Sequence, residues 1–460
     1  MKPVARAFLS ATAMTAAASL AAPLAAQTTS SARSAGMAGA YQAIATGAEA
    51  IRWNPANLGF PDRPSWSLSL PRLNLAGTIL GPGVTDVKDI LDKGDDLTDH
   101  DRQLFLGKVP DAGFELSGGA SIPWVSLSVG PFAAEASTTV LAGGSVGKEM
   151  MDLMLYARQY GDIDHERLSE YRVGNTALRD AAYSTLALSY GRQVNSLVPL
   201  PFPVSVGVTA RYVKGHDLQR GRIFEPSVDI DAEELSIQAL SLRSTGGSGY
   251  GVDVGVSARP LPALTVGLSV QNLVQKMEWK EQLELRGHLF RSTELADMSV
   301  GDMYDQLESR PFDPSSAPLE AYALANEIYE QTYFPRVVRL GAALRSGSTT
   351  LGATYSTTAG KGELSEGWPS YLAAGIEQKL PFLSFLIVRG GAATSLDGAT
   401  AFSGGTTIQL GPVGISAAIS RLKGNNESST PGTFDSTRFA NRLAAGDGVG
   451  FSFGIDLRGN

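Results

Sequence analysis

The 460-residue sequence contains no cysteine, which excludes disulfide frameworks, zinc ribbons, lipid-modified cysteines and thiol nucleophiles. Charged residues make up only 18% of the chain, whereas soluble globular domains typically have about 25%. The net charge of −8 disfavours nucleic acid as a partner, because lysine and arginine must neutralise a phosphate backbone. Beyond residue 26 there is no run of roughly 18 apolar residues, so no transmembrane helix is predicted.

Histidine is almost as scarce as cysteine. A transition-metal centre prefers clustered histidine or cysteine, and a serine hydrolase on a barrel wall needs a histidine on a strand beside its serine. The four histidines are dispersed, and all of them fall in segments predicted to be loops, at His100, His165, His216 and His288. We therefore expect no catalytic residues, no metal site, no cofactor and no enzymatic activity.

The first 26 residues have the three parts of an export signal. Lys2 and Arg6 form a basic start, an alanine-rich apolar stretch runs from Ala7 to Leu20, and small residues precede Gln27. This order is typical of a secretory signal peptide, although a disordered alanine-rich leader has a similar composition. An exported chain without a transmembrane helix is secreted, periplasmic, or a β-barrel in the outer membrane.

Several later segments alternate between apolar residues and small or polar residues. Val204, Val206 and Val208 fall on one face of a strand, with Ser205 and Gly207 on the other. Each such run has about ten residues, the length that a tilted strand needs to cross hydrocarbon. We predict fourteen strands, at residues 65–79, 112–129, 132–142, 181–193, 203–215, 248–258, 263–274, 336–345, 349–358, 370–379, 384–395, 400–410, 413–422 and 446–457.

The lengths of the connections distinguish a barrel from a soluble sandwich. Period-two strands fit a secreted β-sandwich or another periplasmic protein equally well. Alternation of tight turns with large loops, together with an even strand number, is typical of an antiparallel outer-membrane β-barrel. We therefore predict an all-β, fourteen-stranded transmembrane barrel over residues 65–458. Its long outer loops are expected at 80–111, 143–180, 216–247, 275–335, 359–369 and 423–445, with only 396–399 short on that side.

The predicted outer loops are acidic and partly helical. Aspartates crowd the first loop, but their spacing does not match a calcium-binding loop, and a solvated acidic face explains them better. Helices are predicted at Lys148–Tyr160 and 317–333. Their apolar stripes either shelter a hydrophobic ligand at the barrel mouth or, as is more common, pack the loops onto their neighbours. The candidate ligand-binding residues are Met150, Met151, Met154, Leu155, Leu324 and Ile328.

The segment before the first strand is rich in alanine and glycine. A fourteen-stranded barrel encloses more space than its own side chains fill, so residues 27–64 are expected to fold into the lumen. Within this segment Pro55 restricts Asn54 to extended conformations, and the Asn54 amide can bond to nearby backbone. Trp53 offers a large surface for packing against the wall.

These residues also carry a resemblance to a known family. The run resembles the amino-terminal signature of FadL-type outer-membrane transporters, a group that includes PorV-like and TraF-like barrels. The matching residues are Gly36-Met37-Ala38-Gly39-Ala40-Tyr41, then Ala43, Ala45 and Ala48, and finally Trp53-Asn54-Pro55-Ala56-Asn57-Leu58. The sequence departs from the signature where Thr46-Gly47 replaces an acidic residue, with Glu49 the next nearest, and where Asn57 follows the Asn-Pro-Ala motif.

The resemblance implies a hatch that occludes a fourteen-stranded barrel, with Gly36, Gly39, Trp53, Asn54, Pro55 and Ala56 as gating residues. A tight turn without a gating role is the alternative interpretation. Because a shared fold does not fix a substrate, the fold transfers more safely than the function.

The sequence thus predicts an outer-membrane protein that contacts membrane lipid and takes up or binds hydrophobic, fatty-acid-like molecules. The alternative is a non-transporting scaffold, or a secretion or assembly accessory barrel, that holds a protein partner at its outer loops. A purely structural role in the envelope is a third reading.

Overall fold

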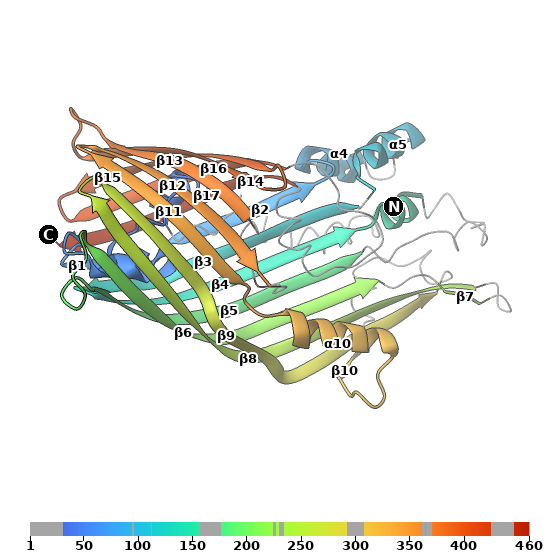
Figure 1. Cartoon of the computed structure of the whole chain (residues 1–460). Coiled ribbons are helices and arrows are strands. Elements are labelled where there is room, and N and C mark those ends of the chain that lie inside the picture. Colours follow the sequence, from blue (N-terminus) through green and yellow to red (C-terminus); the bar gives the residue numbers. More distant parts are fainter. Residues whose placement is uncertain are drawn as a thin grey trace.

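The computed structural model describes residues 31–93, 96–111, 113–156, 176–223, 227–229, 234–291, 308–360, 364, 370–424 and 446–459. The predicted export signal, residues 1–26, lies outside this range. Within it, antiparallel strands form one closed β-barrel (Figure 1). The predicted fold class is confirmed.

The wall of the barrel contains fourteen strands. The first is divided into β1 and β2, and both halves pair with β3 on one side and with β17 on the other, which closes the ring. Two short strands, β7 (Ser227–Asp229) and β10 (Glu308–Pro311), pair only with β8 and β9 respectively. The wall strands are β1 (Trp66–Ser69), β2 (Leu73–Leu80), β3 (Phe114–Val129), β4 (Phe132–Val146), β5 (Ala177–Gln193), β6 (Val204–Ile223), β8 (Glu234–Leu261), β9 (Leu264–Arg291), β11 (Arg336–Ser346), β12 (Thr349–Ala359), β13 (Ser370–Lys379), β14 (Leu386–Ser395), β15 (Thr400–Leu410), β16 (Val413–Lys423) and β17 (Asp447–Gly459).

The wall has apolar side chains outside and small polar side chains inside. This arrangement is the reverse of a soluble sandwich, which buries its apolar face. It suits hydrocarbon outside the ring, because closure leaves no unpaired backbone edge in lipid. Exposed residues on the outer face include Leu186, Leu188, Leu340, Leu372, Phe402 and Ile419, whereas buried residues on the inner face include Ser128, Ser205, Thr209, Ser257, Thr354 and Ser452.

The two ends of the barrel differ in their connections (Figure 1). At the tight-turn end, where the C-terminus lies, Gly130, Gly347 and Gly411 occupy two-residue turns with φ of +54°, +58° and +60°. These left-handed conformations favour glycine because it has no Cβ. The long-loop end carries the helices α4 (Val84–Lys93), α5 (Asp99–Lys108), α6 (Lys148–Tyr156) and α10 (Leu319–Gln331). No helix among the described residues is long and apolar enough to span a membrane.

Five strands at the long-loop end are longer than the sequence pattern indicates. β4 and β5 continue into both ends of the predicted loop 143–180, over residues 143–146 and 177–180, and three others extend much further. Residues 216–247 and 275–335 are not simply loops, because β6 continues to Ile223 while β8 and β9 each contain 28 residues. The added parts of β6, β8 and β9 form a wall extension whose inner face is covered by α10. Bulky side chains such as Trp279 pack against that helix, and Arg243 of β8 pairs with Asp217 of β6, so the alternation of small and apolar residues seen in the other strands is lost.

A charge on the outer face should destabilise the barrel. Leu340 is 56% exposed in the middle of β11, so we expect Leu340→Arg to lower the free energy of unfolding in lipid by about 2–4 kcal/mol. Leu319→Arg is the matched control, because Leu319 lies on α10 and is 83% exposed. Urea unfolding in bilayers measures both variants, and an equal loss in the two would contradict the assignment of the outer face.

Candidate functional site

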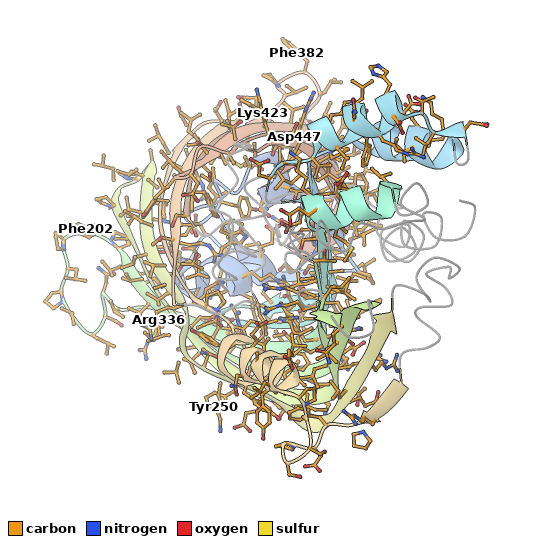
Figure 2. The ribbon with its side chains drawn as sticks, turned by 90° about the vertical axis from the view of Figure 1, so that its right-hand side faces the viewer. Phe202, Tyr250, Arg336, Phe382, Lys423 and Asp447 are labelled. Carbon is orange, nitrogen blue, oxygen red and sulfur yellow. The ribbon has the colours of Figure 1, made fainter. Side chains whose placement is uncertain are left out.

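Residues 31–60, which we call the luminal segment, lie inside the barrel near the tight-turn end (Figures 1 and 2). The structure describes all of these residues, and all but Arg33, Thr46 and Arg52 are buried. The segment contains four short helical elements, α2 (Ala32–Gly36), η1 (Gly47–Glu49), α3 (Ala50–Trp53) and η2 (Pro55–Gly59). Of the predicted insert 27–64, residues 27–30 lie outside the described residues, and Pro61 and Asp62 are exposed. The role of the insert as a hatch stays a prediction.

Glycines on the inner face of the wall let the luminal segment lie directly against the strands. A Cβ added at any of these positions would come within 2.0 to 3.1 Å of an atom of the segment. Real Cβ atoms do not approach other atoms below 3.0 Å, so at nearly all of these positions a larger residue would displace the segment. We call this set the glycine belt; it runs through β5 to β15 as Gly191, Gly207, Gly255, Gly267, Gly341, Gly352, Gly375, Gly391 and Gly405.

The strand register joins the glycines of the belt into short paired runs. Gly207 pairs with Gly191 on one side and with Gly255 on the other. Gly375 likewise pairs with Gly352 and Gly391. Within each run neighbouring strands present glycines at the same height, whereas between runs the register steps by two residues: Gly255 pairs with Ser269, Gly341 with Thr354 and Gly391 with Ser403.

The Asn-Pro corner lies against one half of this belt. Asn54 has an extended backbone, and its Oδ1 accepts a hydrogen bond from the Ala56 amide at 3.0 Å. Its Nδ2 donates to Ser257 Oγ at 2.9 Å, and Ser205 Oγ donates to the Ala56 carbonyl at 2.6 Å. The predicted residues Asn54, Pro55 and Ala56 are thus brought together at the wall strands β6 and β8.

Asn57, which the sequence marks only as a departure, ties the luminal segment to itself. Its Nδ2 donates to the carbonyl oxygens of Gln42 and Ala45 at 3.0 and 2.9 Å. Its Oδ1 accepts from Ser257 Oγ at 2.6 Å, so one amide joins both halves of the segment and β8. A glycine at this position could make none of these side-chain bonds.

The other predicted gating residues have distinct surroundings. Trp53 is buried, and its ring meets Tyr41 edge-on at 5.8 Å and the Arg339 guanidinium at 5.1 Å. Gly36 lies against Gly405 of β15. Gly39 has φ of +83°, which glycine adopts without strain, so its role is to turn the chain after α2.

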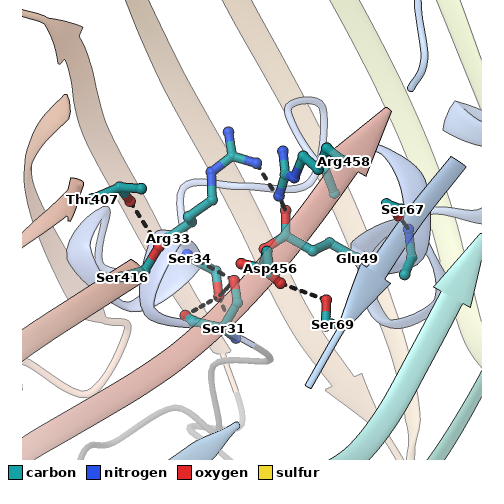
Figure 3. Close-up of polar contacts among 12 residues, drawn as sticks. Ser31, Arg33, Ser34, Glu49, Ser67, Ser69, Thr407, Ser416, Asp456 and Arg458 are labelled. Carbon is teal, nitrogen blue, oxygen red and sulfur yellow. Dashed lines mark hydrogen bonds and ion pairs between the residues drawn. The ribbon is translucent and has the colours of Figure 1, made fainter. Parts of the chain in front are cut away.

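A buried ion network holds the α2 half of the segment (Figure 3). Glu49 Oε2 accepts from Arg33 Nη1 at 3.0 Å, from Arg458 Nη2 at 3.2 Å and from the Tyr41 hydroxyl at 2.7 Å. Glu377 on β13 pairs with Arg33 at 3.4 Å and with Arg389 at 2.6 Å. The network therefore joins the luminal segment to β13, β14 and β17.

The charge state of Glu49 follows from this network. Glu49 is on the luminal segment and not on a membrane-spanning strand. Burial raises the pKa of its carboxyl, but Arg33 and Arg458 outweigh burial and hold the pKa well below its ordinary value. The Glu49 carboxylate is buried, so separation from both partly exposed arginines would leave an uncompensated buried charge, which is why such networks resist separation.

A second ion network lies on the opposite side of the segment. Glu135 of β4 accepts from Arg52 Nε at 2.5 Å and from Arg72 Nη2 at 3.1 Å. Arg72 occupies the break between β1 and β2 and is almost completely buried inside the barrel. The break in the first strand thus places Arg72 inside the barrel, where it binds the Glu135 carboxylate that also binds Arg52 of the luminal segment.

The candidate ligand-binding residues of the outer loops are not brought together. Met150, Met151 and Leu155 pack around Phe105 and Phe114 in one cluster. Leu324 and Ile328 pack on the wall extension around Trp279 in another. The side chain of Met154 lies outside the described part of the chain. Both stripes are buried against neighbouring elements, and their role as a ligand mouth stays a prediction.

The histidine expectations need a correction. His216 and His288 lie on β6 and β9, because these strands extend beyond the predicted ends. His216 Nε2 is 2.8 Å from Ser184 Oγ of β5. The same Ser184 hydroxyl lies 3.0 Å from Thr138 Oγ1 of β4. His165 lies outside the described residues, which contain no cluster of metal-ligating side chains.

Substitution in the glycine belt should displace the luminal segment. A Cβ at Gly391 would lie 2.3 Å from the Met37 carbonyl carbon, whereas one at the adjacent Gly390 would meet its nearest atom at 3.9 Å. We expect Gly391→Ala to lower the free energy of unfolding by about 1–3 kcal/mol and to expose residues 31–60 to protease. Gly390→Ala should leave both unchanged, and equal behaviour of the two variants would contradict the close contact.

Comparison with known proteins places this barrel among related folds. A search of curated proteins finds no match. Among solved structures, a TodX deltaS2S3 mutant monoaromatic hydrocarbon channel has a TM-score of 0.51 and 11% identity, over 93% of this chain and 97% of that one. The Ralstonia pickettii toluene transporter TbuX has a TM-score of 0.49 and 13% identity, over 92% and 98% of the two chains. A Pseudomonas aeruginosa FadL homologue has a TM-score of 0.47 and 14% identity, over 95% and 100%.

The first of these shows the same fold, which confirms the predicted resemblance to FadL-type and TraF-like barrels. A family model matches residues 108–355, more than half of the chain. The protein therefore belongs to the family described as "F plasmid transfer operon, TraF, protein".

Proposed function

We propose that this protein is an outer-membrane barrel that takes up or binds hydrophobic small molecules, with passage controlled by the luminal segment. The apolar outer face of the closed wall supports a location in a membrane. The fold shared with a monoaromatic hydrocarbon channel supports an apolar substrate class, such as hydrocarbons or fatty-acid-like molecules.

One observation carries the proposal. The luminal segment lies against consecutive wall strands from β5 to β15, so a molecule that moves along the barrel axis has to displace it. The buried apolar clusters around Trp279 and Phe105 belong to the opposite, long-loop end. A ligand that enters among those clusters would reach the segment from the loop side.

Release of the segment has a definite energetic requirement. It breaks the Glu49 ion network, the hydrogen bond that Asn54 donates to Ser257 and the one that Asn57 accepts from Ser257. A ligand shifts such an equilibrium only by its difference in affinity for the two states. We infer that a transported molecule binds more tightly to the state in which the segment is displaced. It would do so, for example, by contacting the glycine belt that the displaced segment exposes.

A scaffold is the second candidate function. The extent of the contact between the luminal segment and the glycine belt favours permanent closure over opening. In this reading the helices α4, α5, α6 and α10 hold a protein partner at the outer loops, and the barrel serves as the membrane anchor. A family description that names a plasmid transfer operon agrees with an assembly role.

A disulfide between the luminal segment and the wall separates the two functions. A Cβ on Gly47 would lie 3.3 Å from the Cβ of Ser67 on β1, close to the span of about 3.5–4.5 Å in a disulfide. The chain has no other cysteine, so Gly47→Cys with Ser67→Cys forms a single defined bond. We expect oxidation to abolish uptake of radiolabelled oleate by cells that express the variant, and reduction to restore it.

Two controls accompany this experiment. Ser67→Cys with Ser128→Cys joins β1 to β3 within the wall, where the two hydroxyls are 2.7 Å apart, and should leave uptake unchanged. The reduced double variant accounts for strain at Gly47, whose φ is +58°. Uptake that persists when the segment is bonded to the wall would reject the hatch, and a stoichiometric protein partner in the purified complex would then support the scaffold.

A further inference from the structure

We propose that cations and tyrosines on the outer face of β6, β8, β9 and β11 bind the phosphate groups of an outer-leaflet glycolipid. This surface, which we call the cationic patch, consists of Lys214, Lys276 and Arg336 with the rings of Tyr212 and Tyr250. The inference rests on the proposed location in an outer membrane. It concerns a lipid site on the outside of the wall, and it is independent of transport through the lumen.

The strand register brings these side chains together. Tyr212 of β6 pairs directly with Tyr250 of β8, which pairs with Lys276 of β9. Since neighbouring strands are about 4.8 Å apart, these three residues span about 10 Å. Lys214 follows Tyr212 on the same outward face, two residues nearer the long loops.

Arg336 completes the patch at the start of β11. Its guanidinium donates to the Leu273 carbonyl of β9 at 3.2 Å, which holds it beside the strand that carries Lys276. Figure 2 shows Tyr250 and Arg336 on the outside of the ring, pointing away from the barrel axis. Both residues are exposed, as are Lys214, Lys276 and Tyr212.

The height of the patch fits lipid head groups. Towards the tight turns, the outward residues of the same strands are apolar, such as Val206 and Val208 on β6 and Leu340 on β11. Towards the loops, the strands do not end but continue as the wall extension to Ile223 and Arg291. A head group at this height therefore lies against a protein wall. By contrast, a lysine or arginine at the end of a barrel strand extends into water and offers a head group no protein surface to pack against.

Charge and ring chemistry identify the occupant. Lys276 forms an ion pair with Glu278 at 2.8 Å, and Lys214 and Arg336 place two further cations on the exposed face of the same surface. Phosphates are bound by lysine and arginine, and sugar rings stack on tyrosine. The long-loop side of such barrels faces outward, so the phosphorylated glycolipid of the outer leaflet is the membrane component within reach.

The neighbouring surface supplies further polar groups at the same level. Ser184, which pairs with Lys214 across the strands, contacts His216 Nε2 at 2.8 Å. His216 is exposed on the wall extension. Their hydroxyl and imidazole groups give a glycolipid hydrogen-bonding partners beside the cations.

Binding of defined lipids to the purified full-length protein tests this proposal. The probes are bis-phosphorylated lipid A, its dephosphorylated form and phosphatidylethanolamine, each added in detergent and measured by native mass spectrometry. We expect selective retention of bis-phosphorylated lipid A, and a loss of affinity of at least about tenfold in Lys214→Gln/Lys276→Gln/Arg336→Gln. The variant Lys214→Arg/Lys276→Arg should retain binding, because it keeps both positive charges.

A matched triple variant controls for net charge. The control residues Lys88 and Lys93 lie on α4, and Lys148 lies on α6, so all three are outside the cationic patch. The variant Lys88→Gln/Lys93→Gln/Lys148→Gln removes the same charge. Equal loss of lipid A in the two triple variants, or equal retention of the dephosphorylated form, would overturn the proposal. Oleate uptake by the same variants is measured separately, so a failed lipid site and a failed transport function give different results.

Discussion

The structure depends on the absence of side chains along the glycine belt of the inner wall. The glycine belt lets the backbone of the luminal segment approach the strands more closely than any other residue allows. Directional bonds then fix the segment in position, through Asn54 and Asn57 on one half and through Glu49 on the other. The glycines of the wall thus allow the close contact, and the polar side chains of the segment determine where along the wall it is bound.

This contact explains two features that otherwise look unrelated. The chain contains 51 glycines, and part of that excess lies at inward positions where the segment passes. The segment itself is rich in alanine and glycine, and these small residues let its backbone lie close to the wall, while larger residues such as Tyr41 and Trp53 pack against each other. Both compositions thus follow from one geometric requirement. The polar interior and apolar exterior follow from a second requirement, that every strand edge be paired where lipid surrounds the ring.

The sequence predicts the wall well where its two faces differ in chemistry. The strand at 370–379 has the predicted bounds, and those at 336–345 and 413–422 differ by one residue, because small residues face the lumen and apolar residues face outward. The pattern fails beyond the membrane level. There Trp279 packs on α10 and Arg243 pairs with Asp217. Bulky and charged residues replace the alternation of small and apolar residues, so the sequence of these strands resembles that of a loop.

Part of the site is also readable from the sequence. Asn54 and Pro55 are identifiable because each restricts the backbone in a residue-specific way. Gly207 and Gly267 carry a signal that went unused, since both fall on the inward phase of predicted strands. The pairing of Glu49 with Arg458, or of Arg33 with Glu377, has no local signal, because hundreds of residues separate the partners and only closure of the ring brings them together.

Amide hydrogen exchange of the full-length protein in detergent tests most directly whether the luminal segment is held in the barrel. Hydrogen-bonded backbone that is enclosed by the wall exchanges only when it is released. The account predicts that residues 34–57 exchange as slowly as the wall strands β11 to β16. Exchange of these residues within seconds, while the wall strands stay protected, would contradict it.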